Sequence, residues 1–232
     1  MNLSRVGRFA EVAAVALLWT AVVAGSAVMA LTVPAYTSTM TQALGVPASA
    51  GLSRSDAVKL ADQVRALVAD STYDPLPATW RGAPAFDDAA VSHLLDVRGV
   101  ISTARIATGL ASLLLAGYVA FCVGKRRLRV LASGMKGGAA LSVAVVALAL
   151  IVAVSDFSWF FTAFHGLFFA SGTWTFPADS LLIRLFPEPF WMASGAAWAA
   201  LIGLGAAVLL VAARLVRGVS ERVYASRTAS NV

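Results

Sequence analysis

The stretch VAAVALLWTAVVAGSAVMALTV, residues 12–33, runs for 22 residues without a charge. A helix needs about 20 apolar residues to cross the roughly 30 Å hydrocarbon core of a bilayer. The stretch therefore predicts a membrane-spanning helix. A cleaved signal peptide is the alternative, because Arg5 and Arg8 precede the stretch and it contains small residues near its end. The apolar run is longer than the usual signal core of about 7–15 residues, which favours an uncleaved helix.

Three further stretches of the same kind follow, at residues 106–123, 139–154 and 190–213. The chain is 59% hydrophobic and 13% charged, and its mean hydropathy is +0.79, so it is more apolar than a soluble domain. We expect an all-α membrane protein with four transmembrane helices and two extracytoplasmic segments, the first with room for a short β-hairpin. The expected helices cover residues 12–33, 104–123, 139–155 and 190–213, and the outer segments cover residues 34–103 and 156–189.

Basic residues near the helix ends predict the orientation in the membrane. Five of them lie in residues 124–138, whereas the segment between the third and fourth helices contains only Arg184. We therefore expect the N-terminal residues 1–11, the basic loop 124–138 and the tail 214–232 to be cytoplasmic. The net charge of +6 reflects this topology and does not imply binding to nucleic acid.

The first outer segment contains a predicted amphipathic helix at residues 53–70, because Ser53 and Asp56 form a capping-box pattern and apolar residues then recur at helical spacing. Residues 74–86 contain three prolines and a glycine, which indicates a loop or a short hairpin. A further helix is expected to begin at Asp87 or Asp88 and to continue into the second span. A tilt of this helix, or a break at Gly99, would bring its His93 to the depth of the lipid headgroups.

The second outer segment contains ten of the chain's 22 aromatic residues. Tryptophan is common at membrane interfaces, but this density of phenylalanine predicts a segment that enters the acyl region. On a helix, Phe157, Phe161, Phe164 and Phe168 share one face, and His165 lies beside that face.

The chain has two histidines, and they lie in different outer segments. Burial among aromatic rings disfavours the charged imidazole, so it lowers the pKa and keeps the ring available as a base. Asp96, three residues after His93, could orient the ring of His93. The alternative for each histidine is a hydrogen-bonded anchor at the interface without a chemical role, and the residues alone leave both interpretations open.

Two motifs nevertheless resemble a known family. HLLDVR (93–98) and FHGLFFASGTWTFPADSLLIRLFPEPFW (164–191), framed by four spans, resemble the bacterial lipoprotein intramolecular transacylases, called Lit. The second motif is the more specific, with its FH-x-x-FF pattern, a later tryptophan and PEPFW at its end. An acidic residue expected about three positions before the first histidine is absent, and the nearest preceding acids are Asp87 and Asp88.

The resemblance implies a reaction, a location and a set of residues. The enzyme would sit in the bacterial plasma membrane and move the sn-2 acyl chain of an S-diacylglyceryl-cysteine lipoprotein to the α-amino group of that cysteine, which leaves the lyso-form. It implies His93 and His165 as catalytic residues and no metal or other cofactor. The expected supporting residues are Asp96, Arg98, Trp174, Asp179 and Glu188, and the expected acyl groove consists of Phe161, Phe164, Phe168 and Phe169.

The chemistry suits two histidines. An α-amino group has a pKa near 8, so it must lose a proton before it attacks, and the departing sn-2 oxygen must gain one. One base and one acid suffice, and no acyl-enzyme is needed because donor and acceptor share one molecule. The oxyanion of the tetrahedral intermediate needs donors, for which backbone N–H groups around Gly172 or the side chain of Trp174 are candidates.

The expected partners are a diacylglyceryl lipoprotein or another lipid ester of the outer leaflet, together with membrane lipids, and the oligomeric state is not indicated. Two other functions remain open: a non-enzymatic membrane protein that acts as an interaction partner or accessory subunit, and a metal-dependent membrane hydrolase. A hydrolase would need His93, His165 and an aspartate as ligands, but the sequence contains no H-E-x-x-H motif.

The distribution of basic residues predicts the result of a topology experiment. Tags inserted at residue 130 and at the C-terminus should be protected from protease in intact cells, whereas tags near residues 80 and 178 should be cleaved. Cleavage of the tag at residue 130 would contradict the orientation.

Overall fold

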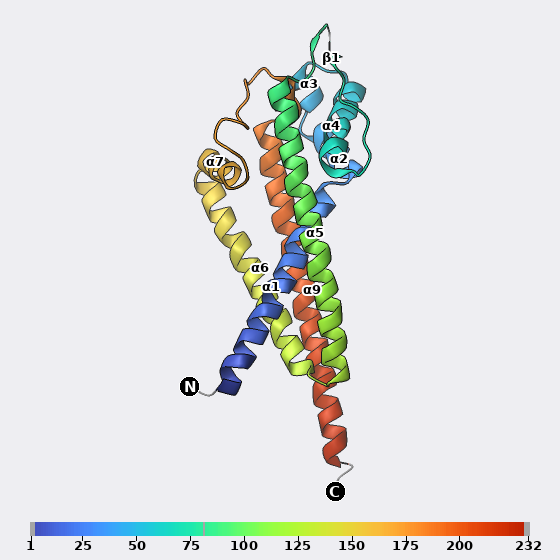
Figure 1. Cartoon of the computed structure of the whole chain (residues 1–232), viewed down its shortest axis with the longest axis vertical. Coiled ribbons are helices and arrows are strands. Elements are labelled where there is room, and N and C mark those ends of the chain that lie inside the picture. The colour runs from blue at the N-terminus through green and yellow to red at the C-terminus, as the bar shows by residue number, and fades with distance from the viewer. Residues whose placement is uncertain (1–2, 81, 230–232) are drawn as a thin grey trace. The chain divides into compact units, whose positions relative to one another are not determined.

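The computed structural model describes residues 3–80 and 82–229, so the outermost residues of the expected terminal segments 1–11 and 214–232 lie outside the described residues. Four helices are long and apolar enough to cross a membrane (Figure 1). They are α1 (Leu3–Leu31), α5 (Asp88–Gly124), α6 (Leu128–Ser155) and α9 (Glu188–Ala229). The expected all-α membrane fold with four transmembrane helices is confirmed.

These helices extend beyond the charge-free stretches that predict them. The expected basic loop 124–138 is mostly helical, since α6 begins at Leu128, and only residues 125–127 separate it from α5. Lysine, arginine and leucine favour helix, so a charge ends the lipid-compatible stretch without ending the hydrogen-bonded helix. The helix α5 also runs unbroken through Gly99, because a single glycine costs only about 1 kcal/mol within a long helix, so the break that we considered there is wrong.

Shorter elements make up the rest of the outer segments. The first segment forms α2 (Pro34–Ala43), α3 (Val46–Ala50), α4 (Arg54–Ala69) and an antiparallel pair of two-residue strands, β1 (Thr79–Trp80) and β2 (Ala83–Pro84). The second forms α7 (Phe157–Phe168) and α8 (Leu181–Leu185). The amphipathic helix, the hairpin and the helix start at Asp87 are therefore all confirmed, whereas α2, α3 and α8 carried no clear sequence signal.

Local capping explains where two of these helices begin. The Ser53 hydroxyl accepts a hydrogen bond from the Asp56 amide at 3.1 Å, which caps α4. The Asp87 carboxylate accepts one from the Ala90 amide at 2.7 Å, which caps α5. Each bond satisfies an N–H group that a helix N-terminus otherwise leaves without a partner.

The chain forms two compact units. The described part of the first, here called the membrane unit, consists of residues 3–27, 106–150 and 199–229. The second, here called the outer unit, consists of residues 28–105 and 151–198, apart from residue 81. Each unit is described by itself below.

In the membrane unit, glycines let α1 and α6 approach closely. A Cβ atom added at Gly134 would lie 2.5 Å from Val15, and one added at Gly138 would lie 2.5 Å from Trp19. The Thr20 hydroxyl donates to the Gly138 carbonyl across the same contact at 3.2 Å. Small residues at helix contacts are a common device for packing helices in lipid, where no hydrophobic effect drives association.

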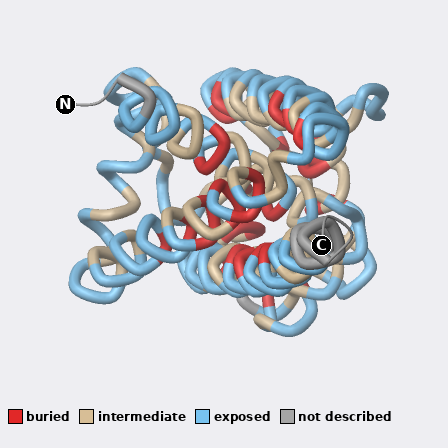
Figure 2. Tube along the Cα trace, turned by 90° about the horizontal axis from the view of Figure 1, so that it is seen from below, coloured by how far each residue is buried: buried red, intermediate tan, exposed pale blue. Residues whose placement is uncertain are grey.

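The outward sides of the membrane unit are apolar and exposed. Leu113, Leu148 and Leu204 are 70%, 65% and 63% exposed, and Figure 2 shows exposed residues along the long helices while buried residues lie on their inner sides. Leucine side chains in this density on a surface are stable only against lipid or another apolar partner.

The core of the outer unit is built from both outer segments. Val46, Leu60 and Leu94 come from the first segment, and they share one buried cluster with Leu185 and Phe190 from the second. About 70 residues is small for an independent core. The second segment therefore completes the core of the first, and this shared packing draws the two segments together.

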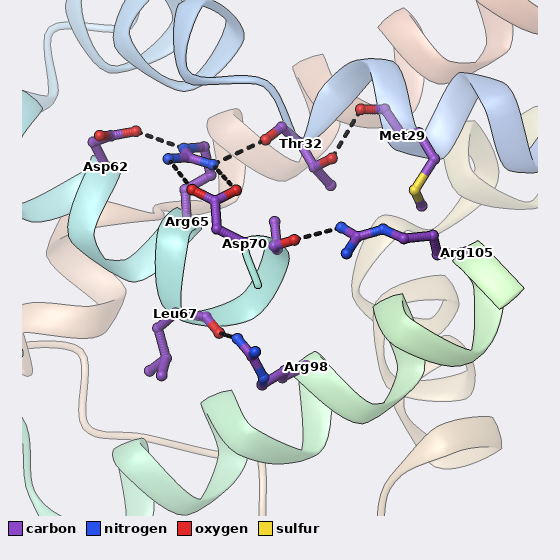
Figure 3. Close-up of polar contacts among 9 residues, drawn as sticks. Met29, Thr32, Asp62, Arg65, Leu67, Asp70, Arg98 and Arg105 are labelled. Carbon is purple, nitrogen blue, oxygen red and sulfur yellow. Dashed lines mark hydrogen bonds and ion pairs between the residues drawn. The ribbon is translucent and has the colours of Figure 1, made fainter. Parts of the chain in front are cut away.

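An ion-pair network centred on Arg65 fixes the end of α4 (Figure 3). Its guanidinium is 7% exposed and donates two parallel hydrogen bonds to the Asp70 carboxylate, at 2.8 and 2.9 Å. It also donates to Asp62 and, at 3.3 Å, to the carbonyl of Thr32. This one side chain therefore ties α4 to the segment that follows α1.

Two further arginines hold the last turn of α4 against α5 (Figure 3). Arg98 donates to the carbonyl of Leu67, and Arg105 donates to the carbonyl of Ala69. The last carbonyls of a helix have no partner within it and carry partial negative charge, so arginine is a suitable cap. Arg98 also lies over the Tyr73 ring, 4.8 Å from its centroid.

We expect Asp70→Asn to destabilise the outer unit, because it removes the carboxylate that accepts two hydrogen bonds from the buried guanidinium of Arg65 and leaves only Asp62 to balance its charge. The loss should be on the order of 1–3 kcal/mol of unfolding free energy. Hydrogen bonds from Arg65 lower the pKa of Asp70, so this stabilisation is complete above the unfolded-state pKa of about 3.9 and disappears as the pH falls through the lower folded-state pKa.

Thermal unfolding of the purified protein between pH 3 and pH 7 measures both effects. The variant should unfold at a lower temperature at pH 7 and lose less on acidification than the wild type. Glu221→Gln is the matched control, since Glu221 and its partner Arg217 are both more than half exposed and such a pair contributes only about 0.3–0.5 kcal/mol. Equal effects of the two substitutions would contradict the role given to Arg65.

Candidate active site

The two histidines stand on separate helices of the outer unit. His93 lies in the second turn of α5, ahead of the charge-free stretch at residues 106–123. His165 lies in the last turn of α7. Asp156 caps the N-terminus of that helix, because its carboxylate accepts a hydrogen bond from the Trp159 amide at 2.9 Å. The cap fixes where the helix begins and therefore where His165 lies along it.

The structure brings the two imidazoles together. Their centroids are 6.1 Å apart and their planes differ by 29°, although the residues are far apart in the sequence. The expected convergence of His93 and His165 is therefore confirmed. Rings at this distance can contact the same small group, such as one ester and the amine that attacks it.

Aromatic side chains enclose both rings. His93 contacts Phe169 and Phe176, with centroids 4.9 and 5.5 Å away. His165 contacts Phe161 and Trp174, with centroids 4.0 and 4.7 Å away. His93 is only 8% exposed, and His165 is half-buried. The pair thus lies in an apolar environment with partial access from outside.

Hydrogen bonding distinguishes the two rings. Nδ1 of His165 lies 2.8 Å from the carbonyl oxygen of Phe161. A carbonyl can only accept, so Nδ1 carries the proton and the neutral ring keeps its lone pair at Nε2. Nδ1 of His93 is buried and has no hydrogen-bond partner among the described residues. A buried polar atom of this kind is uncommon in native proteins, and a water molecule or a ligand can complete its hydrogen bonding.

The surroundings favour the neutral form of both rings. Burial lowers the pKa of His93, a charge on His165 would lower it further, and the Asp96 carboxylate partly opposes the shift. Burial also lowers the pKa of His165, against the smaller effect of the bond to the Phe161 carbonyl. Since an ordinary histidine has a pKa near 6.5, both rings are mainly neutral at neutral pH.

Not all the residues expected to support the site are near it. Asp96 is exposed and acts on His93 only through its charge. Arg98 packs on α4 and Tyr73, so its observed contacts are structural. Asp179 lies exposed in the loop before α8, and Glu188 lies exposed in the first turn of α9.

The expected groove residues do join the histidines. Phe161 and Phe169 contact the imidazoles directly, Phe164 lies 5.7 Å from His165, and Phe168 lies 5.1 Å from Phe164. Phe176, which contacts His93, was not among the expected site residues. In the sequence, the one indication that Phe176 belongs to the site is its position two residues after Trp174. Alternate residues of an extended segment point to the same side.

The residues that the structure describes contain no group of three or more histidine, cysteine, aspartate or glutamate side chains close enough to hold a metal ion. Around the histidine pair, the described groups offer imidazoles that can transfer protons in apolar surroundings, beside an indole that can donate a hydrogen bond.

Known structures share this fold. The chain is similar to the membrane-integral lipoprotein intramolecular transacylase Lit of Bacillus cereus, with a TM-score of 0.80 and 15% identity, over 93% of this chain and 98% of that one. Structures of two Bacillus cereus Lit variants, with a histidine replaced by arginine or by alanine, are also similar. Their TM-scores are both 0.75, at 14% and 15% identity, over 94% and 96% of this chain and 96% and 100% of theirs.

Sequence comparison with curated proteins gives no significant match. The family profile described as lipoprotein intramolecular transacylase Lit, in contrast, matches residues 12–191. Because that match covers well over half of the chain, and because the fold is that of the solved Lit structures, the protein belongs to the Lit family of lipoprotein intramolecular transacylases.

Proposed function

We propose that this transacylase moves the sn-2 acyl chain of an S-diacylglyceryl-cysteine lipoprotein to the α-amino group of the same cysteine, with His93 and His165 as its acid–base pair. The observation that carries the proposal is the 6.1 Å separation of the two imidazoles within a cluster of aromatic side chains. Two histidines that act as separate interfacial anchors do not need to lie side by side, whereas an acid–base pair does.

The reaction requires one proton to leave the amine and one to reach the departing oxygen. As the nitrogen attacks the ester carbonyl carbon, one neutral ring accepts the amine proton. When the bond between that carbon and the sn-2 oxygen breaks, the pair returns a proton to this oxygen, so that an amide and a free hydroxyl result. Such proton transfer is worth about 10²–10⁴-fold in rate, and the shared substrate supplies the proximity.

The apolar pocket supports this role of the histidines. Lowered pKa values keep both rings unprotonated at neutral pH, as a base must be. The Phe161 carbonyl holds His165 in the tautomer whose Nε2 is free to accept. Phe161, Phe164, Phe168 and Phe169 lie where they could hold the acyl chain beside the rings.

The exposed side of α7 supports access from the lipid. None of the residues of α7, all of which are described, is buried, and Trp159 and Leu167 are 61% and 79% exposed. A helix with apolar residues on every side is stable when it is surrounded by apolar material. We therefore infer that α7 lies in the outer leaflet, which is the cell-exterior side if both termini are cytoplasmic, and that the acyl chains of the substrate reach the pocket along it.

His93→Asn and His165→Asn should each abolish formation of the lyso-form while leaving expression and membrane insertion unchanged. Asparagine keeps polarity and some hydrogen bonding but cannot shuttle a proton, so a loss of about 10²-fold or more is expected. The double variant should be little worse than either single one, because residues that act as a unit are not additive. Mass spectrometry of the N-terminal peptide of a model lipoprotein measures the product.

Phe164→Leu and Asp96→Asn serve as matched controls from the same two helices. The first should cause only a mild loss, because leucine offers a similar apolar shape. The second should also be mild, because Asp96 is exposed and makes only a charge interaction with His93. An acyl group still found on the amine in the double histidine variant would contradict the catalytic role and favour a non-enzymatic protein.

Spin labelling can measure the depth of α7. In a Cys122→Ser background, a label at Leu167→Cys should be accessible to oxygen and shielded from a water-soluble nickel reagent, because the helix is immersed in acyl chains. A label at Asp179→Cys, in the exposed loop, should show the opposite accessibilities. Equal exposure of both labels to the nickel reagent would place α7 in water and refute lateral access.

A further inference from the structure

The indole N–H of Trp174 is a buried donor without a partner among the described residues. The ring lies beside the histidine pair, 4.7 Å from the centroid of His165 and 31° from its plane. The ring also makes an edge-on contact with the ring of Phe161, with the two centroids 6.3 Å apart. Native proteins rarely leave such a donor unsatisfied unless a ligand or water completes it.

A second tryptophan of the outer unit has an indole N–H with a hydrogen-bond partner and can be compared with Trp174. Trp191 also has its ring 6.3 Å from that of Phe161, but its N–H donates to the carbonyl of Phe186 at 2.9 Å. Trp19, in the membrane unit, has a buried N–H without a described partner as well. The missing partner alone therefore does not mark a site. Trp174 differs from both because its unpaired donor belongs to a ring in contact with His165.

The turn before Trp174 is well fixed. The carbonyl of Ala170 accepts hydrogen bonds from both the amide and the hydroxyl of Thr173, at 3.2 and 2.9 Å. Gly172 has φ = 86°, a left-handed conformation that glycine adopts without strain. These bonds hold the turn from which the side chain of Trp174 extends.

Acyl transfer needs a hydrogen-bond donor for the oxygen of the ester carbonyl. When the amine attacks, the π electrons of the ester carbonyl move onto its oxygen, and they return when the bond to the sn-2 oxygen breaks. An indole N–H only donates and keeps its proton throughout. It can therefore stabilise the transient oxyanion without competing with the histidines for the proton in transit, and a low-dielectric pocket strengthens the interaction.

We propose that Trp174 donates its indole N–H to the carbonyl oxygen of the ester as the tetrahedral intermediate forms, and that it is therefore a catalytic residue. This assignment rests on the proposed function, since it requires the reaction to occur beside His165. The assignment extends the proposed function, because it names the group that donates a hydrogen bond to the oxyanion.

The test replaces only the N–H group. Trp174 is exchanged for β-(3-benzothienyl)alanine, in which sulfur takes the place of the nitrogen and the ring shape is kept, and Trp174→Phe is made alongside. The purified enzyme acts on a synthetic diacylglyceryl lipopeptide in mixed micelles. Both variants should lose about 10²-fold or more in kcat, with KM changed by less than about threefold, because the bond strengthens only in the transition state.

Trp191→Phe is the matched control, because it removes an indole whose N–H is already engaged in the fold, and kcat should stay within about fivefold of the wild type. Wild-type kcat in the benzothienylalanine variant would overturn the assignment, whatever Trp174→Phe does to folding. His165→Asn in the same assay separates the two proposals. If that variant is inactive while the Trp174 variants are active, only the oxyanion donor is wrong, whereas an active His165→Asn would refute the acid–base function itself.

Discussion

Leu185 and Phe190 of the second outer segment share a buried cluster with Val46, Leu60 and Leu94 of the first, and the arrangement of the outer unit depends on this packing. Burial of side chains of this size is worth roughly 1.5–3 kcal/mol each. Neither segment has a disulfide to stabilise it, because Cys122 is the chain's one cysteine. The hydrophobic core must therefore hold the two segments together, and the convergence of the histidines follows from it.

Arginine contributes the polar part of the same architecture. Arg65 joins α4 to the end of α1 through Asp70 and Thr32, and Arg98 joins the last turn of α4 to α5. These guanidinium groups bond mainly to backbone carbonyls and to nearby carboxylates, so they satisfy groups that the short helices leave open. Because Arg98 lies on α5, its bond also holds that helix, which carries His93, against α4.

The cluster of aromatic side chains around the two histidines has three properties that suit acyl transfer. It is apolar enough to keep imidazole neutral, and it is lined by phenylalanines suited to an acyl chain. It also retains a few polar atoms without partners in the described chain, such as Nδ1 of His93 and Nε1 of Trp174. Burying such atoms is unfavourable for folding alone, which is a physical reason to connect them with a bound substrate.

Several features of the protein followed from the sequence by itself. Charge-free stretches near 20 residues identify the four spans, because a bilayer excludes charge, and Ser53 and Asp87 mark helix starts through local capping. Sequence also pointed to His93 and His165 as candidates, since histidine is rare in this chain and the motifs around both resemble a family. Each of these signals depends on residues that are close together along the chain.

Only the tertiary structure decided which of these residues meet. The contact of His93 with Phe176, the exposure of Asp96 and the unsatisfied N–H of Trp174 have no local signature. They result from the packing of α5, α7 and the loop before α8 around a core shared by two distant segments. A sequence shows which side chains are available, but the distances and hydrogen bonds that could give them a common role arise from long-range packing, to which every residue of the core contributes.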